Sequence, residues 1–134
     1  MIQENMLMPG VEFRIKNGAQ YKPQHIQQLI QQKTDSYGVP VAFKTEYITE
    51  DLMTRLLRSK EECTILYNPE KKDGLRYVIR FNTQGTYLFI QVNKTNGYPL
   101  DSARFRAAEA VRSLYPKENH WYTIIDDIFE ELFT

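Results

Sequence analysis

The chain has 134 residues, a length at which one domain buries a hydrophobic core without disulfides or bound metals. Its 17 lysines and arginines balance its 17 aspartates and glutamates, so no overall positive charge favours nucleic acids or anionic membranes. Cys63 is the only cysteine, which excludes an intramolecular disulfide and fits a reducing compartment. We therefore expect one cytoplasmic domain over residues 1–134, with neither a signal peptide nor a membrane segment.

Four elements are predicted in the first half of the chain. Apolar and charged residues alternate from Val11 to Ile15, which predicts a half-buried strand. A helix is expected from Pro23 to Tyr37, because proline suits a first helical turn and glycine follows the end. A strand is expected over Val39–Ile48, and a short helix should follow, capped by Thr49 and ending near Lys60.

The second half is predicted to hold three strands and then two helices. Cys63–Asn68 is the first of these strands, and Leu75–Val92 contains two more, joined by a turn. A helix should run from Asp101 or Ser102 to Tyr115, and a last helix from Asn119 to Phe133. The order of elements predicts an α+β fold with an antiparallel or mixed sheet. The prediction includes a C-terminal three-strand meander and about four helices, two of which form a C-terminal αα-hairpin.

The register of the Leu75–Val92 hairpin decides which side chains share a face of the sheet. The sequence from Asn82 to Gly85 suits a type I turn within a loop of three or four residues. A three-residue loop would place the two arginines of the hairpin beside aliphatic residues. We favour the four-residue loop because it segregates the aliphatic residues on one face. The other face then carries Arg76, Val78, Arg80, Tyr87, Phe89 and Gln91.

This second face has two interpretations. Arginines beside exposed aromatic side chains bind single-stranded nucleic acids, and Arg76, Arg80, Tyr87 and Phe89 would form such a surface. The alternative is that a helix covers the face while the arginine stems lie along it with their charges in water. Four expected helices favour the covered arrangement.

The last predicted helix is strongly amphipathic and carries Asp126, Asp127, Glu130 and Glu131 on its polar side. Like charges four residues apart cost about 0.2–0.5 kcal/mol per pair, so a basic group is expected nearby. In an antiparallel αα-hairpin, Arg104, Arg106 and Arg112 of the preceding helix would supply it. The alternative is a basic protein partner that binds Asp127, Glu130 and Glu131, with Trp121 and Phe133 as anchors. The alanines at 103, 107, 108 and 110 predict close packing of the preceding helix.

No pattern in the sequence identifies a catalytic, metal or cofactor site. Cys63 and either His25 or His120 would make a thiolate–imidazole pair only if the fold brought them together. The histidines and the cysteine lack the spacing of zinc ligands. The sequence therefore predicts a non-catalytic protein–protein interaction module or subunit, acting on a protein partner or by self-association. The alternatives are a single-stranded nucleic-acid binder and, third, a small-molecule enzyme around Cys63.

Overall fold

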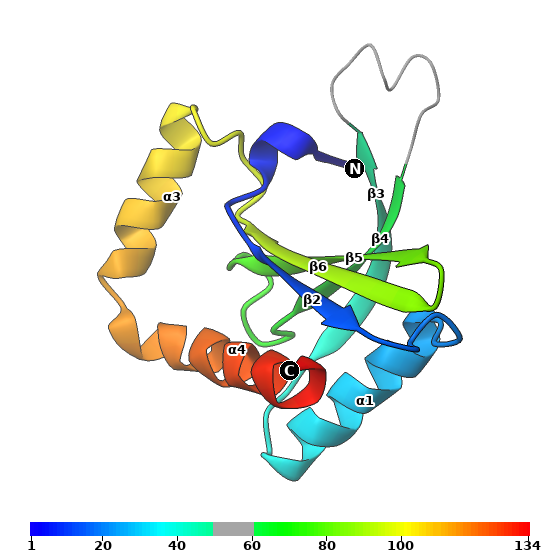
Figure 1. Cartoon of the computed structure of the whole chain (residues 1–134). Helices are drawn as coiled ribbons and strands as arrows, with labels where there is room; N and C mark the ends of the chain where they lie inside the picture. Colours follow the sequence, from blue (N-terminus) through cyan, green and yellow to red (C-terminus); the bar gives the residue numbers. More distant parts are fainter. Residues whose placement is uncertain (50–60) are drawn as a thin grey trace.

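The computed structural model describes residues 1–49 and 61–134 and contains a six-stranded sheet in the order β1-β3-β4-β5-β6-β2 (Figure 1). Its strands are β1 (Ile2–Gln3), β2 (Val11–Ile15), β3 (Ala42–Thr49), β4 (Glu61–Tyr67), β5 (Arg76–Gln84) and β6 (Tyr87–Thr95). Strand β1 pairs parallel with β3, and all other neighbours are antiparallel. The sheet is thus mixed, and the predicted α+β class is confirmed.

Two finer parts of the fold prediction are not confirmed. The antiparallel run of consecutive strands begins at β3, so the C-terminal unit is not a three-strand meander but part of a larger sheet. The described residues contain three α-helices instead of four: α1 (Pro23–Ser36), α3 (Ala103–Ser113) and α4 (His120–Phe133). Thr49, the expected helix cap, is the last residue of β3. The rest of the helix expected there lies outside the described residues.

One face of the sheet is covered by α1 and α4, whose apolar sides pack against the central strands (Figure 1). From the helices, Ile26, Ile30, Ile125, Ile128 and Phe129 are buried against residues of the strands. The apolar positions repeat every three or four residues, which places them on one side of each helix. Burial of these side chains gives the molecule its main hydrophobic core.

The β5–β6 hairpin has a shorter loop than either length expected. Gln84 pairs with Tyr87, so Gly85 and Thr86 alone form the turn, and Gly85 has a φ of +57°. A two-residue loop has the same face assignment as the four-residue loop, because the pairing shifts by an even number of positions. The predicted grouping of side chains is therefore confirmed, although the predicted loop lengths are wrong. Residues 82–84, which resemble turn residues, instead extend the strand.

The N-terminal segment covers much of the second face of the sheet. It forms β1 beside β3, the short 3-10 helix η1 (Glu4–Met6), and a link in which the Met8 amide donates to the Lys94 carbonyl at 2.8 Å. Beneath it lies a smaller core made of Ile2, Leu7, Ile48, Cys63, Ile65 and Val78. Much of the second face is thus covered, but by an irregular segment and not by the helix that we expected.

The predicted antiparallel αα-hairpin is wrong. A 3-10 turn, η2 (Pro116–Asn119), joins α3 to α4, and the two helices diverge from it at a corner (Figure 1). Pro116 opens this turn and prevents the α3 helix from continuing. The arginines of α3 therefore do not lie along the acidic side of α4.

Candidate functional site

Polar contacts at its ends and along one side hold helix α3 against the rest of the protein. Ser102 caps it, with Oγ accepting a hydrogen bond from the Phe105 amide at 3.1 Å. Asn96, just after β6, donates to the Glu109 carboxylate at 3.2 Å. Glu109 pairs with Arg112, which also donates to the side-chain oxygen of Asn119 at 3.1 Å. This chain of contacts connects the end of β6 with the start of α4 through the inner side of α3.

The outer side of α3 exposes its apolar residues. No side chain of the helix is buried. Residues spaced three and four apart form an exposed apolar stripe, which we call the α3 stripe: Ala103, Ala107, Ala110, Val111 and Leu114. Leu114 is 72% exposed and Val111 58%. Of the alanines that we expected at a packed interface, Ala103, Ala107 and Ala110 are exposed and Ala108 is half-buried. The helix turns its polar side, with Glu109 and Arg112, toward the body of the protein.

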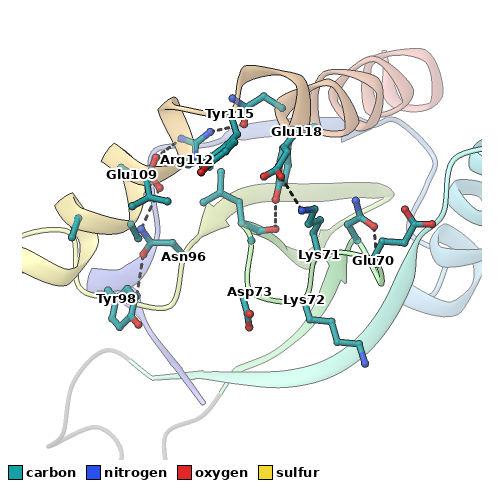
Figure 2. A pocket seen from close by; sticks show the side chains of 18 of the residues that line it. Glu70, Lys71, Lys72, Asp73, Asn96, Tyr98, Glu109, Arg112, Tyr115 and Glu118 are labelled. Atoms are coloured by element: carbon teal, nitrogen blue, oxygen red, sulfur yellow. Dashed lines mark hydrogen bonds and ion pairs between the residues drawn. The ribbon is translucent and has the colours of Figure 1, made fainter.

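A cleft of about 740 Å³ lies between α3 and the loop that connects β4 to β5. Ala107, Ala108 and Val111 line its helical wall, and Tyr122 of α4 also lines it. Figure 2 shows Lys71 reaching across to Glu118 at 2.8 Å, whereas Lys72 and Asp73 point away from α3. Its volume is in the range of ligand-binding pockets, and its small alanine side chains leave room for groups from outside.

The charges that line this cleft are balanced, and Lys71 and Arg112 form salt bridges with Glu118 and Glu109. Its four basic residues, Lys71, Lys72, Arg104 and Arg112, are matched by four acidic ones, Glu70, Asp73, Glu109 and Glu118. The hydrogen bond from Lys71 to Glu118 raises the lysine pKa, so its amine stays protonated. Burial raises the pKa of Tyr122, whose hydroxyl donates to the Leu75 carbonyl at 3.0 Å. Neither shift activates the Lys71 amine or the Tyr122 hydroxyl as a base or a nucleophile.

The residues expected to bind nucleic acid lie on one face of the sheet, but Arg80 is occupied. Its side chain is 11% exposed, and its guanidinium forms a salt bridge with Glu4 at 2.5 Å and a hydrogen bond with Asn93 at 3.3 Å. Tyr87 and Phe89 stack with ring centroids 6.1 Å apart near the exposed hairpin tip. The Arg76 side chain has no hydrogen bond or ion pair with the described residues. Glu4 of the N-terminal segment thus compensates the charge of Arg80.

The acidic side of α4 finds its basic partners on β6 and α1. Asp126 accepts from Lys94 at 3.1 Å and from the Tyr77 hydroxyl at 2.8 Å. Glu131 pairs with Lys33 at 3.2 Å and accepts from the Tyr37 hydroxyl at 2.7 Å, and this hydrogen bond lowers the Glu131 pKa. The prediction that Arg104, Arg106 and Arg112 compensate the acidic side of α4 is therefore wrong.

The remaining predicted binding residues are divided between surface and core. Asp127 and Glu130 stay exposed, and their carboxylates have no hydrogen bond or ion pair with the described residues. Trp121 is buried, and its indole N–H donates to the Pro40 carbonyl at 2.8 Å. Phe133 is also buried and packs on Phe13. Neither aromatic side chain is available as an anchor on the surface.

The structure gives no support to a catalytic Cys63. The thiol is 3% exposed, and burial raises its pKa to about 12, so it is protonated at neutral pH. Cys63 lies in the smaller core on the second face, whereas His25 belongs to α1, which packs on the first face. The sheet therefore separates the two groups. His120 is an exposed residue at the start of α4.

Within residues 1–49 and 61–134, no group of three or more histidine, cysteine or carboxylate side chains is placed to hold a metal ion. No helix in that part of the chain has the length and hydrophobicity needed to cross a membrane. No protein-family model, curated protein or solved structure matches this chain. Its chemistry must therefore be inferred from the site itself.

The exposed position of α3 was not predicted from the sequence. The signal was present in the spacing of the alanines with Val111 and Leu114, which marks one apolar side of the helix. Spacing alone cannot say whether such a side packs inside the molecule or faces outward. The polar contacts of Asn96 and Asn119, which are remote in sequence from each other, decide the orientation.

Proposed function

We propose that this protein is a non-catalytic protein–protein interaction module that docks through the α3 stripe and the adjoining cleft. The observation that carries the proposal is that α3 buries none of its side chains yet exposes Val111 and Leu114. Helices in proteins gain most of their stability from packing an apolar side. A partner that covers this side would supply the packing that the single chain does not provide.

The charges around the α3 stripe favour an acidic, amphipathic helix of a different protein as the partner. Arg104 has no hydrogen bond or ion pair with the described residues, and Arg106 donates only to the Asp101 carbonyl at 3.2 Å. These arginines flank the stripe on its two sides, as their helical positions require. Two copies of α3 packed together would bring four such arginines close, which opposes self-association through this surface.

Affinity capture with matched variants tests the proposal. We expect the wild-type chain to retain a partner from an extract of its source cells, and Val111→Asp/Leu114→Asp to lose it. Arg104→Glu/Arg106→Glu should weaken retention at low salt and make it less sensitive to salt, because the ionic contacts that salt screens are lost. Thr123→Asp, on the exposed side of α4, is the control and should retain the partner.

Light scattering of the same variants distinguishes the kinds of partner. A purified monomer is expected for the wild type, and a dimer that Val111→Asp/Leu114→Asp dissociates would identify a second copy as the partner instead. Retention that is equal in all variants, together with a monomeric wild type, would contradict docking through α3.

The two other functions suggested by the sequence receive less support. Single-stranded nucleic-acid binding would require Arg80, whose charge is already compensated by Glu4 of the N-terminal segment. Chemistry at Cys63 would require a thiolate, which burial disfavours. The interaction surface at α3 requires no rearrangement of the described residues.

A further inference from the structure

Strand β2 forms one edge of the sheet and has an open side. It pairs with β6 and, as the last strand in the sheet order, has no second strand neighbour among the described residues. Val11 at its start is 52% exposed. Alternate residues of an edge strand direct backbone N–H and C=O groups outward, where another extended chain can pair with them. This edge is separate from α3 and from the cleft beside it.

A groove of about 370 Å³ runs next to this edge, between β2 and α4. Phe13, Val92 and Phe129 give it an apolar base. Phe13 and Val92 belong to the face of the sheet that α4 covers. A strand added beside β2 would direct every second side chain toward the same face, and therefore into or over this groove.

The charge of the groove identifies the kind of chain that fits it. Its rim carries Asp126, Asp127 and Glu130, against a single lysine, Lys94. Lys94 is already paired with Asp126, whereas the carboxylates of Asp127 and Glu130 have no partner among the described residues. These carboxylates also lie in the C-terminal half of α4, where the helix dipole disfavours negative charge. A basic side chain placed between them would reduce this unfavourable interaction.

We propose that the open edge of β2 and the adjoining groove bind an extended segment of a partner protein whose basic and apolar residues occupy every second position, on the side that faces the groove. The segment adds a strand to the sheet, so the main-chain hydrogen bonds provide a sequence-independent part of the affinity. An apolar side chain contacts Phe13 and Phe129, and basic side chains pair with Asp127 and Glu130. This inference goes beyond the proposed function, because it concerns a second surface with a partner of opposite charge.

A labelled eight-residue peptide tests the inference by fluorescence anisotropy. In this probe, threonine alternates with arginine and valine, so that arginine and valine share one side of the extended chain. We expect saturable binding that Asp127→Lys/Glu130→Lys weakens by about ten-fold, as expected for the loss of two ionic contacts with added repulsion. Glu70→Lys/Asp73→Lys, in the loop beside α3, makes the same change of charge elsewhere and should leave the affinity within about two-fold.

Two modified peptides separate strand addition from simple charge attraction. N-methylation of alternate backbone amides removes strand hydrogen bonds without changing charge, and it should abolish binding. Replacement of both arginines by glutamate should also abolish it. Three results would each overturn the inference. The first is an unchanged affinity after N-methylation, and the second is the absence of saturable binding. The third is that Asp127→Lys/Glu130→Lys and Glu70→Lys/Asp73→Lys weaken binding equally. Val111→Asp/Leu114→Asp should bind the peptide normally, so failure here is distinct from failure at α3.

Discussion

The side chain of Cys63 shows how burial determines chemistry at a single residue. Its thiol lies under the N-terminal segment, and burial holds its pKa at about 12. Glu46 and Glu61 oppose ionisation further, and among the nearby charges of the described residues only Arg80 favours it. The cysteine therefore behaves as a small apolar residue of the core.

We expect Cys63 to react with a disulfide reagent only when the chain opens. Compared with a thiol whose pKa is near 9, a pKa of about 12 reduces the thiolate fraction at neutral pH by about a thousand-fold. Thionitrobenzoate release should thus be very slow in native buffer and fast in urea. A native rate equal to that of a free thiol would contradict the burial of Cys63 and would reopen the enzymatic alternative.

The same pKa shift predicts a dependence of stability on pH. The folded chain keeps the thiol proton to higher pH than the unfolded chain, so the stabilisation is complete below the unfolded pKa and is lost as pH rises through the folded pKa. Cys63→Ala has no thiol, so its stability should not fall in this way as pH rises. The difference in urea midpoint between wild type and variant should therefore narrow between about pH 8 and about pH 10.

At the scale of an element, α3 should unfold locally without unfolding the molecule. Its cap, Ser102 Oγ to the Phe105 amide, contributes about 1 kcal/mol in typical helices. Ser102→Ala should therefore speed hydrogen exchange of the amides in residues 103–113 by about five-fold. Exchange in α4 and the urea midpoint should not change, because α3 buries no side chain.

Ser113→Ala is the matched control, since it makes the same substitution at the other end of α3. Ser113 Oγ donates to the Ala110 carbonyl, which caps no free amide. We expect no change in exchange of the first turn. A fall in the urea midpoint of Ser102→Ala would show instead that α3 contributes to the global stability.

Periodicity in the sequence predicted the elements better than it predicted their neighbours. Alternation in β5 and β6 correctly separated the two faces, because a face assignment survives any even shift of register. The predicted loop lengths were wrong because Asn82, Thr83 and Gln84 are residue types common in turns, whereas in the structure they extend strand β5. The orientation of α3 was not predicted, because apolar spacing identifies one side of a helix but does not show whether that side is buried or faces solvent.

For the molecule as a whole, the N-terminal segment acts as the cover of the second face. Leu7 is 8% exposed within the smaller core. Leu7→Ala should reduce the free energy of unfolding by about 2–3 kcal/mol and should increase binding of the dye ANS, because it opens a cavity at this cover. Urea denaturation and dye fluorescence measure the two effects.

Leu114→Ala makes the same substitution on the 72% exposed side of α3 and serves as the control. We expect its effect on stability to stay within about 0.5 kcal/mol, as for most surface positions. Equal losses in both variants would contradict the contrast in burial. The sequence did not predict this cover, since residues 1–10 show neither helical nor strand periodicity and their contacts lie on strands distant in sequence.

The order of the strands also determines when the sheet can finish folding during synthesis of the chain. Residues 1–15 supply β1 at one edge of the sheet and β2 at the other, where residues 11–15 pair with residues 88–92. Leu88–Val92 leave the ribosome long after the segment that must pair with them. Contacts so distant in sequence slow folding, and unpaired strands favour aggregation while they wait. The nascent chain should therefore depend on chaperones until its sixth strand has emerged.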